Sequence, residues 1–123
     1  MKKNIFLILF ACTFFAISAN AQEQNADAVV QSELTKEVFT VYGNCGMCER
    51  TIEGSLKDVV GISLGDWDKE TDQMSVSFDP AVISLDAIKQ KIADVGYDSD
   101  SHRAKEEVYN NLPGCCQYER PSN

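Results

Sequence analysis

The sequence predicts an α+β fold of the ferredoxin-like type: a four-stranded antiparallel sheet with two helices on one face, followed by a C-terminal tail that contains cysteines. Two observations support this prediction. Strand-like alternation and helix-like spacing of apolar residues follow each other in the order β-α-β-β-α-β between residues 36 and 103. This order in a segment of fewer than 70 residues is the split βαβ arrangement.

The first 21 residues have the organisation of a secretory signal peptide. Lys2 and Lys3 form a basic start, residues 5–17 are almost entirely apolar, and a small-x-small site ends at Ala21. An apolar run of about 13 residues is too short to span a bilayer. We therefore expect cleavage near Ala21, export to a periplasmic or secreted location, and no stable membrane insertion afterwards. A lipoprotein modified at Cys12 is the alternative, which the bulky side chain two residues earlier disfavours.

The composition of the remaining 102 residues argues against several classes of protein. Removing Lys2 and Lys3 with the leader changes the formal net charge from −8 to −10. A chain of this length forms one small domain with tails, so a large multidomain enzyme is excluded. Because phosphate binding needs clustered Lys and Arg, the acid excess argues against a nucleic-acid binder. We expect a soluble monomer, with a metal-bridged dimer as the alternative.

The first half of the domain follows a polar, aperiodic segment over 22–35, which indicates a flexible linker. The β-branched and aromatic run 38–42 predicts the first strand. A loop then leads to a helix that starts near Cys48 and ends before Gly61, a suitable C-cap. The apolar face of this helix is predicted from the spacing of Ile52, Leu56, Val59 and Val60.

Two further strands form a predicted hairpin. Residues 62–64 alternate and lead to Trp67, and the polar residues 68–72 form the turn. The returning strand alternates apolar residues with serines and stops at Asp79-Pro80. Its apolar residues are Met74, Val76 and Phe78.

The second helix is predicted to begin after the N-cap Ser84 and to close at Gly96. Residues 97–104 are a weak candidate for the last edge strand, and we interpret the acid Asp98 as part of a solvated surface. A short helix is expected over 105–112, before a Pro-Gly break. The apolar face of the second helix is formed by Leu85, Ile88, Ile92 and Val95.

The predicted topology brings two distant segments together. In a ferredoxin-like fold, the loop after the first strand and the turn after the second helix lie at the same end of the sheet. Cys45 and Cys48 are therefore expected beside Gly96 and Tyr97.

Cys45 and Cys48 form a C-x-x-C pair at a loop-to-helix junction. Two thiols at this spacing can face one point, and the N–H groups at the helix start favour the thiolate form, here expected on Cys48. Thiolates select soft ions such as Cu(I), Hg(II) and Zn(II). Two ligands suit Cu(I) or Hg(II), since a structural zinc site normally takes four.

The segment from Val41 to Tyr97 resembles the heavy-metal-associated domain family. This family includes copper chaperones, the metal-binding modules of copper-transporting ATPases and the periplasmic mercury-binding protein. The resemblance implies a domain over 36–103, between the leader 1–21 with its linker and a tail over 104–123. The matching motifs are Gly43 with the C-x-x-C loop, Val59-Val60-Gly61-Ile62, Asp79-Pro80 and Gly96-Tyr97.

The resemblance also implies roles for particular residues. In the family the two cysteines bind the metal ion, which assigns that role to Cys45 and Cys48, and an aromatic residue in the last turn lies close to the ion, which points to Tyr97. The family usually has Gly-Met-x-Cys, with the methionine packed under the loop. Here the methionine is Met47, between the cysteines, and we interpret it as packing in the loop rather than as a thioether ligand.

Cys115 and Cys116 form a second close pair in the tail. Adjacent cysteines rarely bridge each other, because the geometry is strained. If the helix over 105–112 carries the chain back, the two thiols approach Cys45 and Cys48 and complete a site of three or four thiolates. A separate thiol pair, or a disulfide to the tail, is the alternative.

These observations together predict an exported protein that carries or sequesters a soft metal ion, Cu(I) first, with Hg, Zn or Cd as alternatives. The expected partner is a metal-donor or metal-acceptor protein, such as a metal-transporting membrane protein. No nucleophile–base or proton-shuttling set is visible, so no enzymatic turnover is expected. Two other functions stay open: thiol–disulfide exchange through the same C-x-x-C pair, and a secreted interaction module held by disulfides.

Overall fold

The computed structural model describes residues 33–122. The predicted signal peptide and nearly all of the predicted linker therefore lie outside the described residues. The elements, in chain order, are β1 (Thr35–Thr40), α1 (Gly46–Gly54), β2 (Ile62–Asp68), β3 (Gln73–Phe78), α2 (Leu85–Asp94), α3 (Glu106–Asn110) and a 3₁₀ turn, η1 (Gly114–Cys116).

The three strands form one antiparallel sheet in the order β1-β3-β2. The register places Phe39 and Trp67 opposite Met74, from either side of the central strand. These three side chains and Val76 are buried, while their chain neighbours on the opposite face are more exposed, apart from Ser77, which is also buried. The alternation predicted for β3 is confirmed, and it directs one face of the sheet towards the core.

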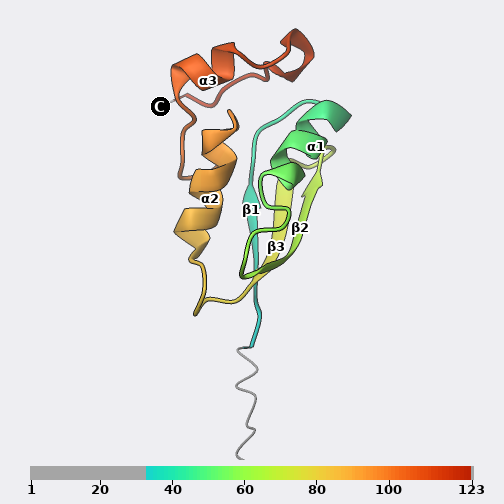
Figure 1. Cartoon of the computed structure of the whole chain (residues 1–123). Coiled ribbons are helices and arrows are strands. Elements are labelled where there is room, and N and C mark those ends of the chain that lie inside the picture. Colours follow the sequence, from blue (N-terminus) through green and yellow to red (C-terminus); the bar gives the residue numbers. More distant parts are fainter. Residues whose placement is uncertain (1–32, 123) are drawn as a thin grey trace, which may run out of the picture.

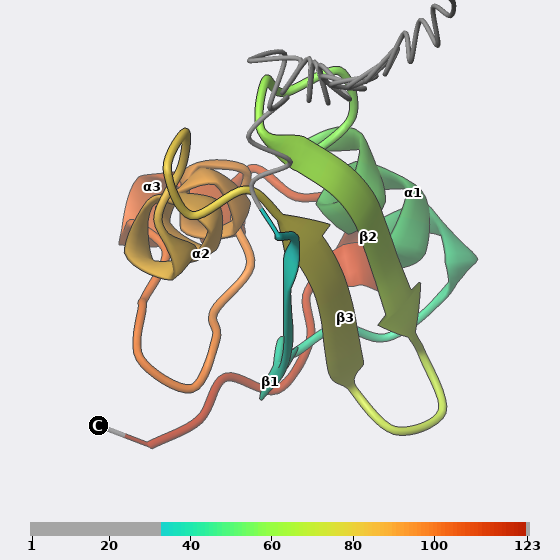
Figure 2. The same cartoon turned by 90° about the horizontal axis from the view of Figure 1, so that it is seen from below.

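The two long helices share this core with the sheet. Ile52 of α1 and Ile88 and Ile92 of α2 are fully buried in the same cluster as the inward-facing strand residues. Figure 2, a view turned by 90°, shows α1 beside β2 and α2 beside β1. Each such buried side chain contributes about 1.5–3 kcal/mol to folding, so the layers are held by apolar packing.

The first helix is shorter than predicted. It ends at Gly54, because glycine is a poor helix former and the Ser55 hydroxyl donates a hydrogen bond to the Ile52 carbonyl at 2.6 Å. A turn follows in which Val60 is 80% exposed, so Val60 does not belong to the buried face. Gly61 is not a helix C-cap but part of the turn into β2, where its φ of +95° favours glycine.

The second helix agrees with the prediction. The Ser84 hydroxyl accepts a hydrogen bond from the Ala87 N–H at 3.1 Å, as expected of an N-cap residue. The helix ends at Asp94, and the Gly96 N–H donates to the Ala93 carbonyl at 3.0 Å.

The predicted fourth strand is wrong within the described residues. Only one isolated antiparallel bridge forms there, between Val41 and Ser99. The chain turns instead, because the Ser99 N–H donates to the His102 carbonyl at 2.8 Å and the Ser99 hydroxyl accepts from the His102 N–H at 3.2 Å. Short polar side chains that bond the local backbone favour such turns over strands.

The C-terminal segment lies across one end of the sheet. Figure 1 shows α3 above the end of α2, with the chain continuing towards the start of α1. The short helix predicted over 105–112 corresponds to α3, which covers five residues. The limits of the predicted domain, 36–103, remain a prediction. In residues 33–122, none of the helices has both the length and the apolar character needed to cross a bilayer.

Candidate metal centre

The C-x-x-C pair lies where the loop after β1 becomes α1. Cys45 is the N-cap residue, with an extended backbone, and Cys48 is the third residue of the helix. Their Sγ atoms are 4.0 Å apart. Cys48 is fully buried, whereas Cys45 is partly exposed. The pair therefore has one sulfur within the core and one that solvent or another molecule can reach.

The electrostatic effect of the helix start falls on Cys45. The backbone N–H groups of Cys48 and Met47 stabilise its thiolate and lower the pKa of Cys45. The sequence predicted a helix start near Cys48, but the helix begins at Gly46, which makes Cys45 rather than Cys48 the residue at the helix start. The Cys48 sulfur instead accepts a hydrogen bond from the backbone N–H of Asn44 at 3.4 Å.

The loop can take this path only because Gly43 has no side chain. A Cβ atom at Gly43 would lie 2.8 and 2.9 Å from two ring atoms of Trp67 and 3.3 Å from the Cβ of Cys48. The indole is itself fixed, since its Nε1–H donates to the Val41 carbonyl at 2.9 Å. The close approach of the loop to this ring positions the two thiols.

Tyr97 lies at the same end of the fold as the cysteines, as the topology predicted. Its side chain is fully buried in the cluster that contains Cys48 and Cys116. Burial, and then the neighbouring thiols of these two cysteines, raise the pKa of Tyr97 far above its ordinary value. Within residues 33–122, the Tyr97 hydroxyl is the one buried side-chain oxygen or nitrogen that lacks a hydrogen-bond partner.

The structure brings the tail cysteines to the C-x-x-C pair. The Sγ atoms of Cys45, Cys115 and Cys116 all lie within 4.8 Å of one another, and those of Cys115 and Cys116 are 3.9 Å apart. Cys115 is exposed and Cys116 is buried, and all four described cysteines are unbridged. Burial, followed by the neighbouring Cys48, raises the pKa of Cys116 to about 12.

We expected Met47 to pack within the loop, but it does not. Its side chain is 48% exposed, and its Sδ atom is 3.5 Å from the Sγ atom of Cys115. This contact brings a fifth sulfur atom to the cluster, which extends from the buried Cys48 and Cys116 to the exposed Cys115 and Met47.

Sequence reasoning missed the residues that hold the tail in place. Asp98, interpreted as a solvated acid, is 1% exposed. It accepts hydrogen bonds from Arg120 and from the Ala104 N–H. Tyr118 is also buried, and its hydroxyl donates to the Gly96 carbonyl at 2.9 Å. The only signal in the sequence was the presence of Tyr118 and Arg120 shortly after the tail cysteines. Hydrophobic periodicity does not show what such isolated residues contact.

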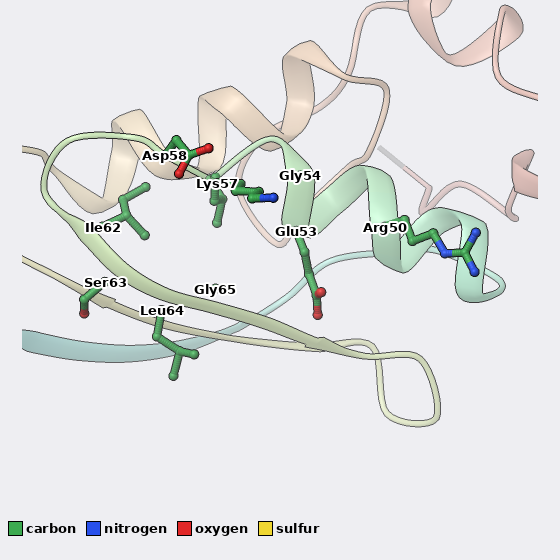
Figure 3. A pocket seen from close by; sticks show the side chains of 10 residues that line it. Arg50, Glu53, Gly54, Lys57, Asp58, Ile62, Ser63, Leu64 and Gly65 are labelled. Atoms are coloured by element: carbon green, nitrogen blue, oxygen red, sulfur yellow. The ribbon is translucent and has the colours of Figure 1, made fainter.

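The hollow of about 620 Å³ between α1 and β2 is separate from the thiols (Figure 3). Arg50, Glu53 and Lys57 contribute to its wall from α1 and the turn that follows, and Leu64 contributes from β2. No cysteine lines it. The candidate metal centre is therefore the sulfur cluster at the end of the sheet and not this hollow.

Comparison with known proteins identifies the segment that contains the C-x-x-C pair. The family described as "Heavy-metal-associated domain" matches residues 38–98. The copper chaperone CopZ of Staphylococcus aureus is 32% identical over 66 residues, which cover 53% of this chain and 97% of that protein.

Solved structures agree with this match. A CopZ metallochaperone superposes with a TM-score of 0.51 at 32% identity, covering 53% of this chain and 98% of the other. The water-soluble region of the P-type ATPase CopA from Bacillus subtilis gives a TM-score of 0.53 at 32% identity, covering 55% of this chain and 46% of the other. The family match ends at residue 98, before the tail cysteines.

Proposed function

Because the chain belongs to the heavy-metal-associated domain family, we propose that it carries a soft metal ion, Cu(I) first, on the thiolates of Cys45 and Cys48. The family and the CopZ relatives support metal-ion binding and transport, and they are carriers rather than enzymes. The observation that supports the two ligands most directly is the 4.0 Å separation of their sulfur atoms at the start of α1.

The chemistry of the pair suits such an ion. Thiolates are soft ligands, and a soft monovalent ion with few ligands is the cargo that two of them accommodate. The lowered pKa of Cys45 increases the fraction of thiolate available to capture the ion. The partly exposed Cys45 is the sulfur that a second protein can reach.

Transfer to a partner follows as thiolate exchange. A partner thiol forms one new metal–sulfur bond as the bond to Cys45 breaks, and the proton released by the incoming thiol balances the one that Cys45 takes up. We propose a metal-transporting membrane protein as this partner, since the soluble region of the P-type ATPase CopA is similar in sequence and fold. The basic and apolar start of the chain supports export, which would place the exchange outside the cytoplasm.

Anaerobic copper analysis of the reduced full chain tests the proposal. The wild type should retain Cu(I) against a competing chelator, and C45S/C48S should lose it. Arg50→Gln is the matched control, because this side chain is exposed on α1 and should leave copper retention unchanged. Equal retention by the wild type and C45S/C48S would contradict the proposal.

An insulin-reduction assay distinguishes carriage from thiol–disulfide exchange. A metal carrier should reduce insulin no faster than free thiols of matched concentration. Rapid insulin reduction by the wild type, combined with no copper retention, would favour the exchange function that the sequence left open.

A further inference from the structure

The C-x-x-C pair alone leaves a bound ion open to further ligands. The Sγ atoms of Cys45 and Cys48 are 4.0 Å apart, less than the length of two metal–sulfur bonds of about 2.3 Å each. An ion bonded to both sulfurs must therefore lie off the line that joins them, with a bent S–metal–S angle. One side of such an ion remains free for other donors.

The tail supplies two thiols at this place. The Sγ atoms of Cys115 and Cys116 lie within 4.8 Å of each other and of the Cys45 Sγ atom. Cys48 is not one of these three mutually close sulfurs, but its Sγ atom is 4.0 Å from that of Cys45, and its side chain is buried in the same cluster as Cys116. These separations are close to those of thiolates that share one ion.

The tail is anchored at the cluster and beyond it. At the cluster, the Cys115 carbonyl accepts a hydrogen bond from the Asn44 side chain at 3.4 Å. Beyond the cysteines, the Tyr118 hydroxyl accepts from the backbone N–H of Asp98 at 2.7 Å, and Arg120 donates to the Asp98 carboxylate at 2.8 Å. The thiols are therefore held against the loop by an exposed contact at Cys115 and by buried or partly buried polar contacts beyond the two cysteines.

Tyr97 provides an independent indication of a ligand. Its hydroxyl is fully buried in the cluster that contains Cys48 and Cys116 and has no hydrogen-bond partner of normal geometry. A buried hydroxyl without a partner costs free energy, and a neutral thiol is a weak acceptor for it. Metal-bound thiolates in the same positions carry negative charge and would accept this hydrogen bond.

We infer that Cys115 and Cys116 bind the same ion as Cys45 and Cys48, so that the chain closes a four-thiolate site for tetrahedral soft ions such as Zn(II) and Cd(II). The inference rests on the proposed function, because it adds two ligands to the proposed pair. Four cysteine thiolates are a complete shell for a tetrahedral ion. The family match ends at residue 98, so the additional ligands belong to the C-terminal extension of this chain.

A consequence concerns release of the ion. In an open two-thiolate site, a partner's thiol enters directly. In the four-thiolate site, Cys115 and Cys116 would fill the remaining positions around the ion, so the bond to one of the four sulfurs must break before a partner thiol can bind. The closed site favours retention of the ion over rapid delivery.

Cadmium binding to the reduced full chain tests this inference. The probe is Cd(II) under anaerobic conditions, followed by thiolate-to-cadmium charge-transfer absorption and by competition with a chelator. C115S/C116S should lose about half of the charge-transfer intensity, as expected for two of four ligands. Its Cd(II) affinity should fall by more than the roughly 10–100-fold that loss of an outer-shell partner costs.

The same measurements separate failure of the inference from failure of the proposed function. Unchanged Cd(II) affinity and intensity in C115S/C116S, with Cu(I) retention lost in C45S/C48S, would overturn the four-thiolate site and leave the proposed pair intact. Unchanged Cu(I) retention in C45S/C48S would overturn both. Because Cys116 is buried, the single variant Cys115→Ser, at an exposed position, provides a test that does not disturb the core. It should lower the Cd(II) charge-transfer intensity by about a quarter, one of four ligands, and no decrease would count against the inference.

Discussion

Arg120 binds both carboxylate oxygens of Asp98, with Nε donating to Oδ2 and Nη2 donating to Oδ1 at 2.8 Å each. The Arg120 side chain is 9% exposed and that of Asp98 is 1% exposed, so the pair is almost entirely removed from water. Asp98 lies in the turn after α2, and Arg120 lies beyond the tail cysteines. This pair therefore connects the two segments that place Tyr97 and Cys116 next to each other.

Removing one member of the pair should destabilise the protein strongly. In Arg120→Ala the Asp98 charge remains buried without its cation, which typically costs about 3–5 kcal/mol. Urea denaturation of the metal-free, reduced chain measures this loss. Arg103→Ala is the matched control, because Arg103 is 40% exposed and 3.8 Å from the same carboxylate, and it should cost much less. Equal losses in the two variants would contradict the proposed importance of Arg120.

The same pair predicts a dependence of stability on pH. Burial raises the pKa of Asp98, but the hydrogen bonds from Arg120 and from the Ala104 N–H together outweigh it and hold that pKa below its ordinary value. A carboxyl whose pKa is lowered by folding stabilises the folded state above its unfolded pKa of about 3.9. This contribution is lost as the pH falls from there through the lower pKa of the folded state.

A comparison with Asp98→Asn isolates this contribution. The wild type should be more stable than the variant near neutral pH, and the difference in unfolding free energy should shrink as the pH falls below about 4. Urea titrations of both proteins at a series of pH values measure it. A difference that stays constant across the acid range would show that the Asp98 charge is not the cause.

Most of the fold could be predicted because it depends on local patterns. The alternation in β3 and the Ser84 N-cap of α2 are visible in short windows of sequence. The end of α1 was predicted too late, because apolar spacing continues past Gly54 while the backbone does not. The fourth strand was predicted where the polar side chain of Ser99 forms a turn instead.

The candidate site likewise has parts that the sequence predicts and parts that it does not. Topology alone predicted that Cys45 and Tyr97 lie at one end of the fold, and the structure places both in one packed cluster. The anchoring of the tail was not predictable, since Arg120 and Asp98 are 22 residues apart and ion pairing between segments leaves no periodic signal. Whether Cys45 or Cys48 lies at the start of α1 depends on the exact residue at which the helix begins, and sequence patterns do not define helix ends that closely.

The contact between the metal loop and Trp67 predicts a second sensitive position. Gly43→Ala would place a Cβ atom 2.8 Å from the indole ring, which forces the loop or the ring to move and should cost about 1–3 kcal/mol of stability. Gly46→Ala, at the first residue of α1, is the matched control, because an added Cβ there meets no atom within 4 Å. Denaturation curves should show that Gly43→Ala is less stable than Gly46→Ala. Competition with a chelator should show that Gly43→Ala also retains less Cu(I). Wild-type stability and copper retention in Gly43→Ala would contradict the role of this close approach.

The stacked rings of Tyr97 and Tyr118, 5.6 Å apart between centroids, predict opposite responses to the same substitution. The Tyr118 hydroxyl accepts from the Asp98 N–H and donates to the Gly96 carbonyl, so Tyr118→Phe leaves two buried backbone groups unpaired and should cost about 1–3 kcal/mol. The Tyr97 hydroxyl has no such partner, so Tyr97→Phe removes a buried polar group that gains nothing and should be neutral or stabilising in the metal-free protein. Thermal or urea denaturation of the two variants, each with one oxygen atom removed, measures the contrast. A larger loss in Tyr97→Phe than in Tyr118→Phe would show that the Tyr97 hydroxyl already has a strong acceptor without any metal ion, and would remove one of the two observations that support the four-thiolate site.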